Sequence, residues 1–236
     1  MSAPPSAVDN GQVVVLLLAD ISQASRLWGW SRIVKGPQAL QGVPGLLFSK
    51  VLGSGYEGGF GLRPSPSRQG LFGLFESLQT AQEFIANSSV LHAYQERSDE
   101  FCWAQLKTWS CRGSWDGHSL EVCAAQPIKG PMAALTRASI KLGKAPAFWR
   151  HAPPAQNALV NAKGCQLAVG LGEAPFVRQA TFTIWDSVAD MNAYARSGAH
   201  LEAIQDAAQN DYFSESMFAR FVPLQVQGQW HGKVYA

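Results

Sequence analysis

The sequence predicts an α+β fold in which two fused ferredoxin-like (βαββαβ) repeats form an intramolecular dimeric α+β barrel. Two observations indicate this class. The second half of the chain repeats segments of the first in the same order, and each half contains the strand and helix patterns of one βαββαβ unit. Such a unit has helices on only one face of its sheet. A second copy of the sheet is the simplest cover for the bare face, so the two halves are expected to close on each other.

Three pairs of segments carry the repeat. In the longest pair, Phe75 and Ser77 of the first half meet Trp185 and Ser187 of the second. The order of the segments is the same in both halves, which indicates duplication rather than chance similarity. The aligned pairs are residues 71–88 with 181–198, 103–117 with 218–232, and 51–55 with 170–174.

Apolar patterning predicts the elements of the first half. Residues 12–19 form a continuous apolar run of the kind found in buried strands, and residues 78–97 place Leu78, Ala81 and Phe84 on one helix face. A break in the first helix is expected at its Gly-Pro pair. The predicted order is strand 12–19, helix 25–40, strand 45–53, strand 69–77, helix 78–97 and strand 101–115.

The second half shows the same order. Asp186 and Ser187 stand where an N-cap belongs, which predicts the start of the last helix. Residues 127–141 (PIKGPMAALTRASIK) are expected to be an insertion that follows the first strand and forms a pocket wall. The predicted order is strand 120–127, a helix near 145–160, strand 165–172, strand 179–185, helix 187–208 and strand 217–226.

The repeat divides the chain into a disordered leader (1–11), an N-terminal half (12–118) and a C-terminal half (119–236) that carries the candidate site. Hydrophobic residues make up 47% of the chain and charged residues 15%, and the formal net charge is +2. This balance predicts no nucleic-acid partner. The early apolar run, 13–19, is too short to cross a bilayer and lacks the flanks of a signal peptide. The four cysteines form no CxxC pair, so a cytoplasmic protein with reduced thiols is expected.

Three common kinds of site are not indicated. The glycine-rich residues 50–61 (KVLGSGYEGGFG) lack the GK[ST] that completes a phosphate-binding loop, and they are expected to form a mobile loop between two strands. No G-x-S-x-G elbow is present. The five histidines do not have zinc-ligand spacing.

A histidine distinguishes the last helix of the second half. His200 shares a helix face with Ala203, Ile204 and Ala207, and the repeat places it opposite Val90 of the first half. One interpretation is a partly buried histidine bonded to a carbonyl. The other is an axial ligand to the iron of a haem b between helix and sheet.

Small and polar residues in this region are compatible with the second interpretation. Ala199, together with Ala203 and Ala207, would leave room for a porphyrin beside the helix. Thr136 and Arg137 are the polar residues of the expected pocket wall, apart from the lysines, and Arg137 could donate to a haem propionate or to oxygen on the open face of the haem. The alternative for Arg137 is a solvated arginine at the barrel rim.

Four segments of the chain resemble a known family. They are FSKVLGSGYEGGF (48–60), GPMAALTRASI (130–140), TFTIWDSVADMNAYARSGAHLEAI (181–204) and FARF (218–221). Together they resemble the spheroidene monooxygenases of bacterial carotenoid synthesis, whereas the first 40 residues resemble that family only weakly. The resemblance implies a haem-containing oxygenase that places a keto group on an acyclic carotenoid such as spheroidene. The oxygen would come from O₂ and the electrons from a donor such as ferredoxin.

The resemblance also implies a role for one residue, because His200 matches the position of the iron-ligating histidine in related haem barrels. The other roles are hypotheses from the sequence itself: Arg137, together with Thr136, would donate hydrogen bonds on the open side of the haem. Phe148, Trp149 and Phe176 would line a slot for a long apolar chain. Such a substrate implies transient contact with a membrane, although the sequence shows no amphipathic basic helix for it.

Two other functions stay open from the sequence. One is a haem-dependent lyase or dehydratase of the aldoxime dehydratase type, which would need no O₂. The other is a non-catalytic protein that binds haem or a hydrophobic ligand. The oligomeric state is also open.

Overall fold

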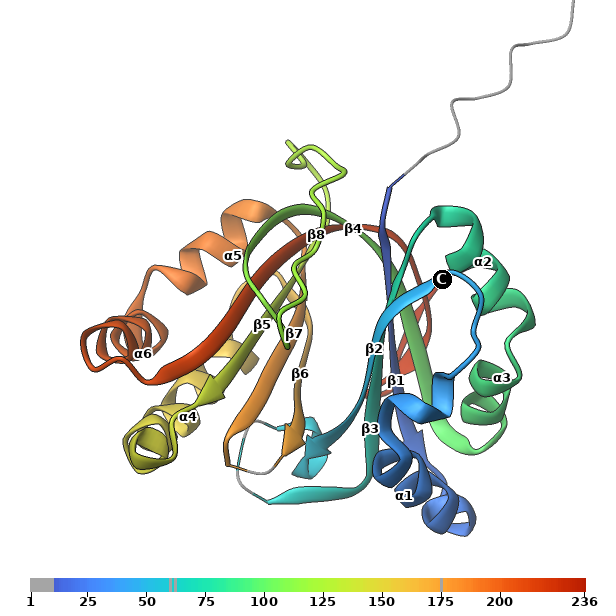
Figure 1. Cartoon of the computed structure of the whole chain (residues 1–236). Helices are drawn as coiled ribbons and strands as arrows, with labels where there is room; N and C mark the ends of the chain where they lie inside the picture. Colours follow the sequence, from blue (N-terminus) through green and yellow to red (C-terminus); the bar gives the residue numbers. More distant parts are fainter. Residues whose placement is uncertain (1–10, 60, 62, 175) are drawn as a thin grey trace, which may run out of the picture.

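The computed structural model describes residues 11–236 except residues 60, 62 and 175 (Figure 1). Of the predicted leader, residues 1–10 lie outside the described part of the chain. Gly11 is buried, and a side chain in its place would meet Cys123.

Eight antiparallel strands form a closed barrel, as the sequence predicts. The hydrogen-bonded order is β4-β1-β3-β2-β6-β7-β5-β8, and β4 also pairs with β8, which closes the ring. A short strand, β9, extends the sheet beside β8. The strands are β1 (Val13–Ile21), β2 (Leu46–Gly55), β3 (Pro64–Phe75), β4 (Ser98–Gly113), β5 (Met132–Ile140), β6 (Cys165–Ala174), β7 (Arg178–Trp185), β8 (Phe213–Trp230) and β9 (Lys233–Tyr235).

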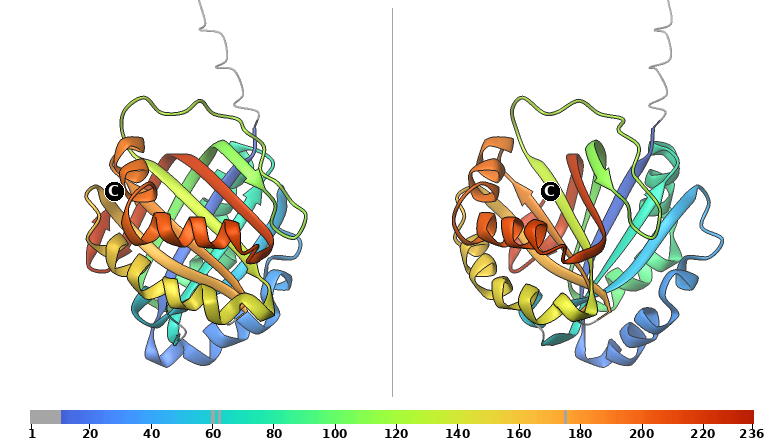
Figure 2. Two further views of the ribbon diagram at one scale, coloured as in Figure 1. Left: turned by 90° about the vertical axis from the view of Figure 1, so that its left-hand side faces the viewer. Right: turned by 60° about the vertical axis from the view of Figure 1, so that its left-hand side comes forward.

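The helices cover the outside of the barrel in two groups (Figure 1). Three of them lie over the first four strands, and the other three lie over β5–β8, where α4 and α6 run side by side across the strands (Figure 2). The helices are α1 (Arg26–Lys35), α2 (Leu78–Asn87), α3 (Ser89–Glu96), α4 (Ala145–Val160), α5 (Val188–Ala195) and α6 (Gly198–Gln209). Four short 3₁₀ segments are Gln23–Ser25, Gly36–Leu40, Tyr56–Gly58 and Leu142–Lys144.

The two halves have the same topology. The strand order of the first half, β4-β1-β3-β2, matches β8-β5-β7-β6 of the second, and equivalent strands pair with each other where the halves meet. We call the two strand pairs at which the halves meet, β4–β8 and β2–β6, the seams of the barrel, and they differ in length. β4 and β8 pair along most of β4, whereas β2 and β6 pair only at Gly53–Gly172 and Ser54–Leu171.

Two groups of apolar side chains hold the layers together. One fills the barrel interior with alternate residues of every long strand, such as Leu16, Phe72, Leu135, Phe182 and Phe221. The other packs the helices against the outer face of each half. Alternation along the strands therefore separates an inner from an outer face, which decides which residues can meet.

Two predictions about elements were wrong. Residues 120–127 form no strand, and the first strand of the second half is β5, so residues 127–141 are not an insertion. Pro127, Gly130 and Pro131 precede the strand rather than break it. Each predicted long helix is also two helices, because Ser88 starts α3 as an N-cap and Ser197 occupies the same place before α6.

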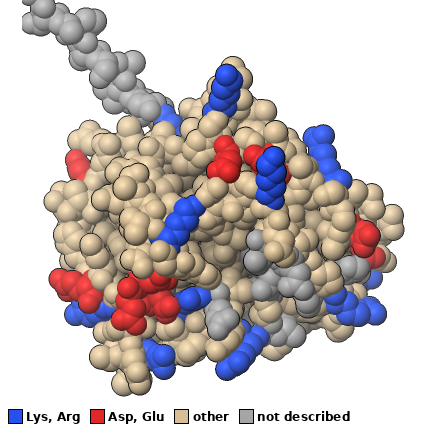
Figure 3. Space-filling view, turned by 180° about the vertical axis from the view of Figure 1, so that it is seen from behind, with Lys and Arg blue, Asp and Glu red and all other residues tan. Residues whose placement is uncertain are grey.

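Three further observations concern the surface and the thiols. Within the described residues, none of the helices combines the length and apolar content that a bilayer crossing requires. None of the four cysteines, all of which lie in the described part of the chain, forms a disulfide. Basic and acidic side chains are interspersed over the face of the molecule in Figure 3 rather than gathered in a band of one sign.

Candidate functional site

His200 lies on the outer side of the second half, in the first turn of α6. Its half-buried imidazole stacks on the ring of Tyr194, with centroids 4.6 Å apart and planes at 24°, and Tyr194 in turn packs on Trp185 at 5.4 Å. Burial lowers the pKa of His200. Among the described residues neither ring nitrogen has a hydrogen-bond partner. The ring is therefore oriented and neutral at pH 7, which is the state that binds a metal.

The alanines predicted to flank a cofactor do turn inward. Ala199 and Ala203 are half-buried and Ala207 is buried, whereas Ile204 is 45% exposed and points away from them. The inner face of α6 is thus made of small side chains next to one imidazole.

The capping serines also refine the comparison between halves, because His200 is the third residue after Ser197 and Leu91 is the third after Ser88. Its structural counterpart is buried Leu91 rather than Val90.

The strand β5 beneath α4 and α6 carries a small and a hydroxylic side chain on its outer face. On the outer face of β5, Ala134 is half-buried and Thr136 is exposed, although this is the face that the helices cover. The corresponding residues of β1, Val15 and Leu17, are fully buried beneath the first-half helices. The described side chains of the second half therefore leave space between sheet and helices that the first half fills.

A hollow of about 600 Å³ opens at the far end of the same helix pair. It lies between the start of α4 and the end of α6, where Lys144, Ala147, Asp206 and Tyr212 line it. Since Ala207 is seven residues beyond His200, about 10 Å along the helix, the hollow and the imidazole belong to one α4–α6 interface.

Thr136 and Arg137 do not share a side of the sheet. Thr136 faces the helices, whereas Arg137 points into the barrel, where 1% of its side chain is exposed. Its guanidinium contacts Glu215, and its second terminal nitrogen lies 3.4 Å from both Asp116 and Glu173. The structure thus separates Arg137 from His200 and from any group bound beside α6.

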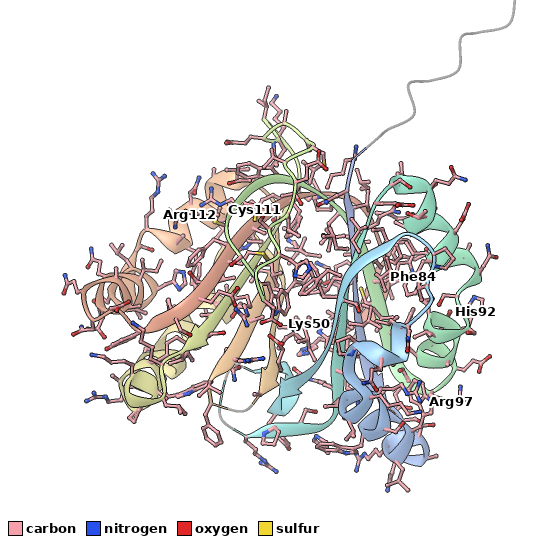
Figure 4. All side chains as sticks on the ribbon, viewed as in Figure 1. Lys50, Phe84, His92, Arg97, Cys111 and Arg112 are labelled. Carbon is pink, nitrogen blue, oxygen red and sulfur yellow. The ribbon has the colours of Figure 1, made fainter. Side chains whose placement is uncertain are left out.

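The carboxylates around Arg137 close the short seam between the halves. Lys50 of β2 binds Asp116 and Glu173, and the indole of Trp115 donates to Glu173 at 2.7 Å. Burial acts to raise the pKa of Glu215, but hydrogen bonds from Gly117, Ser114, Asp116 and Arg137 lower it to about 2. Figure 4 shows Lys50 in the opening between β2 and β6. This network joins the two halves where they share few backbone hydrogen bonds.

The three predicted pocket aromatics lie together. The Trp149 indole donates to the Phe176 carbonyl at 2.9 Å, and the Phe148 ring lies 5.3 Å from that of Trp149 and 6.0 Å from that of Phe213. They form a cluster at the start of α4, and 51% of Phe176 is exposed. The cluster is at the end of the helix pair that carries the hollow, not at the end that carries His200.

The residues present fit a haem on the outer face of the second half. A neutral imidazole is one of the protein ligands that hold a porphyrin-bound iron. Among the described residues no group of three or more His, Cys, Asp or Glu could hold a bare metal ion. The small side chains on the inner face of α6 and on β5 would accommodate a flat ligand next to that imidazole, and Thr136 offers a hydroxyl on the sheet side.

Comparison with known proteins gives the family. The chain is 55% identical over 232 residues to the spheroidene monooxygenase of Rubrivivax gelatinosus, which covers 98% of the chain and 90% of that protein. It is 34% identical to the spheroidene monooxygenase of Rhodobacter capsulatus, over 87% of each chain. The chain belongs to the spheroidene monooxygenase family. No family model matches the sequence.

Solved structures support the fold of this spheroidene monooxygenase family member. An aldoxime dehydratase in complex with butyraldoxime has a TM-score of 0.58 at 9% identity, over 91% of this chain and 80% of that one. A second aldoxime dehydratase structure also has a TM-score of 0.58, at 10% identity. At such low identity the likeness shows the barrel architecture alone.

The sequence analysis missed a group of basic residues in this family member. Arg112 and Arg220, on the outer faces of β4 and β8, and Arg196, at the end of α5, lie near one another on the same side of the sheet as His200. Figure 4 shows Arg112 on the α5 side of the sheet. Burial, first, and the charges of Arg196 and Arg112 lower the pKa of Arg220. Arg220 is the arginine of the FARF segment, so the signal was present in the sequence without an indication of its neighbours.

Proposed function

We propose that the protein is a haem-dependent monooxygenase that inserts oxygen from O₂ into an apolar chain, with an acyclic carotenoid such as spheroidene as its substrate. The family supports the oxygenase role and the class of substrate. The observation that supports the haem is His200, a stacked and neutral imidazole next to the small side chains of α6. Each inserted oxygen atom needs two electrons and two protons, and a small donor such as ferredoxin would supply the electrons.

The residues of the chain would each have a defined part in this reaction. His200 would hold the iron from the α6 side, with its ring plane fixed by Tyr194. Bound haem would supply the chemistry that activates O₂. On the sheet side, the Thr136 hydroxyl would donate or accept a hydrogen bond at the reacting oxygen. Arg137, which lies inside the barrel, would support β5 rather than touch the substrate.

The central experiment is haem binding and turnover with a His200 variant. Wild-type protein reconstituted with haem is expected to show a Soret band and substrate-dependent O₂ uptake in the presence of a reductant. His200→Ala is expected to lose both, while His92→Ala, a histidine on the first-half helix α3, keeps both. Equal haem affinity and an unchanged spectrum in His200→Ala would reject the ligand assignment.

Two other functions are distinguished by the same preparation. A lyase of the aldoxime dehydratase type, which the shared fold favours, would form product under strict anaerobiosis. A non-catalytic haem protein would bind haem and consume neither O₂ nor substrate. O₂ uptake coupled to the carotenoid separates the monooxygenase from both.

The proposal includes contact with a lipid surface through α1. Leu27, Trp30 and Val34 follow each other at helical spacing and are 88%, 44% and 84% exposed, while Arg26 and Lys35 at the two ends of the helix are also exposed. No acidic residue occurs between Asp20 and Glu57. An apolar stripe with flanking cations is typical of helices that lie on anionic membranes, and this feature of α1 supports the proposed contact.

Flotation with lipid vesicles tests this contact. Wild-type protein is expected to float with vesicles that contain phosphatidylglycerol and much less with phosphatidylcholine alone, and Leu27→Ser/Val34→Ser is expected to stay at the bottom. Ile128→Ser, which removes a side chain that is 98% exposed elsewhere, is the matched control. Wild-type protein that fails to float would reject the contact. A double variant that changes the oligomeric state instead would identify a second copy of the chain as the occupant.

A further inference from the structure

Four side chains on the outer face of the second half form an arrangement that the catalytic proposal does not use. A β-bulge in β4, between Thr108 and Ser110 in the pairing with β8, adds Trp109 to the strand. Because of the bulge, Trp109 and then Ser110 and Arg112 all face outward, toward the helices. Bulges of this kind commonly re-aim side chains at functional sites.

The arginines of this region stack on aromatic rings. The Arg220 guanidinium lies 5.5 Å from the centre of the Trp109 ring, and that of Arg112 lies 5.2 Å from the Phe218 ring. Arg112 pairs with Phe218 and Arg220 with Ser110 in the β4–β8 ladder, so the two arginines are diagonal neighbours on one face. Stacking orients a guanidinium and leaves its edge N–H groups free to donate.

This positive charge is not neutralised within the described part of the chain. None of Arg112, Arg196 and Arg220 forms an ion pair with a described carboxylate. The buried Nε1–H of Trp109 has no acceptor among the described residues either. Arg220 is half-buried, whereas Arg112 and Arg196 are exposed. A cluster of this kind, with its buried indole donor, would favour an anionic ligand that accepts from both the arginines and the indole.

The arrangement lies at the His200 end of α6. Trp109 packs in the same apolar cluster as Tyr194, the ring on which His200 stacks. Arg196 ends α5 only four residues before His200. An anionic group bound by these arginines would thus belong to the same ligand as the imidazole.

We propose that Arg112, Arg196, Arg220 and Trp109 form a carboxylate-binding site that takes the propionates of the haem. This inference rests on the proposed function, because it names what anchors the cofactor beside His200. Arg220 and Arg112 provide forked donors that match a carboxylate, and Arg196 adds a third cation from the helix layer. Such a site would give the haem a second attachment to the protein in addition to His200.

The site is tested by comparing how wild type and arginine variants bind two porphyrins that differ only in the charge of their propionates. Apo-protein is titrated with haem and with haem dimethyl ester, whose propionates carry no charge, and binding is followed by the Soret band. Arg196→Gln and Arg220→Gln are each expected to weaken haem binding by roughly tenfold or more and to leave binding of the ester unchanged, because a charge-assisted hydrogen bond contributes about 1.4 kcal/mol or more. Arg220→Lys is expected to recover part of the loss.

The controls separate this inference from the catalytic proposal. Arg26→Gln removes the same charge from the first half and is expected to bind both porphyrins like wild type. His200→Ala is expected to weaken both porphyrins alike. Arginine variants that weaken both porphyrins, or neither, would reject the propionate site while His200 remains the ligand. A wild-type protein that binds neither porphyrin would reject the haem proposal and this site together. Because Arg196 is exposed, Arg196→Gln is expected to fold like wild type.

Discussion

The space between sheet and helices differs sharply between the two halves of the barrel. In the first half it is filled by a large apolar cluster that includes Val15, Leu17, Phe75, Phe84 and Tyr94, each 4% exposed or less. In the second half the buried apolar cluster of this layer is smaller and consists of Met132, Leu159, Trp185 and Met191 among the described residues. Within the described part of the chain, the same topology thus carries a larger apolar core on one side than on the other.

The difference teaches how a duplicated fold separates stability from function. Apolar burial in the first half, at about 25 cal/mol per Å², holds the helices to the sheet without any ligand. The second half replaces large apolar residues with small ones, as at Ala134 and Thr136, and so gives up part of that stabilisation. A bound ligand can restore it, because anything that binds only the folded state stabilises it.

The largest expected effect comes from the interior, where the halves also differ. Arg137 stands at the position of Leu18 in the first half and is 1% exposed. Arg137→Met is expected to lower the free energy of unfolding by about 3 kcal/mol, because it leaves the half-buried carboxylate of Glu215 without its cation and leaves Glu173 with Lys50 and the more distant Arg178. Urea unfolding followed by circular dichroism measures this change.

A second arginine provides the control for that result. Arg178 is 49% exposed and lies 3.8 Å from Glu173, so Arg178→Met is expected to cost less than about 1 kcal/mol. If Arg137→Met and Arg178→Met lower the free energy of unfolding equally, burial of the ion pair does not determine how much an arginine of this network contributes to stability.

Reciprocal exchanges between the halves test the comparison directly. Leu17→Thr is expected to destabilise the protein by about 3 kcal/mol, since it removes buried methyl groups and buries a hydroxyl. Thr136→Leu, at the corresponding place in the second half, is expected to change stability by less than about 0.5 kcal/mol and to weaken haem binding by filling the space. A large loss of stability in Thr136→Leu would mean that the second half is packed as tightly as the first.

The capping serines are places where the halves are alike. Ser77 accepts from the Thr80 amide at 3.2 Å and Ser187 from the Asp190 amide at 3.1 Å. Ser77→Ala and Ser187→Ala are each expected to cost about 1 kcal/mol in thermal or urea unfolding. Ser197→Ala should cost less, because Ser197 makes no side-chain cap bond. If Ser77→Ala and Ser187→Ala lower the free energy of unfolding by different amounts, the helices of one half contribute less than those of the other to the stability of the barrel.

The sequence was sufficient to predict the barrel because burial follows the repeat. Phe75 and Trp185 meet in the alignment, and both are completely buried at the ends of equivalent strands. The strand β5 was missed because its alanines carry no period when both faces are covered by other elements, and the nearby Pro and Gly were taken as part of it. Tertiary contacts rather than local pattern decide such a segment.

The site was predictable only in part, for a similar reason. His200 was found because one half has an imidazole where the other has an apolar side chain. The role of Arg137 depends on carboxylates from three distant segments, Asp116, Glu173 and Glu215, which no local spacing indicates. The arginines beside Trp109 depend on a bulge that shifts the alternation of β4, and a bulge leaves no reliable mark in the sequence.

The smallest effect expected is the response of the ligand-free protein to pH at His200. Burial lowers the pKa of His200 in the folded protein below its ordinary value of about 6.5, so the unfolded chain takes up the proton more readily. Stability contributed by the neutral ring is therefore present above pH 6.5 and is lost as the pH falls toward the lowered pKa. The free energy of unfolding of wild type minus that of His200→Gln, measured from pH 8 to pH 5, should decline on the acid side. With haem bound the decline should be steeper, since iron and the proton compete for the same nitrogen. Parallel pH profiles for the two proteins would show that the His200 imidazole is exposed to solvent. The proposal that the second half of the barrel binds a ligand through a buried imidazole would then be wrong.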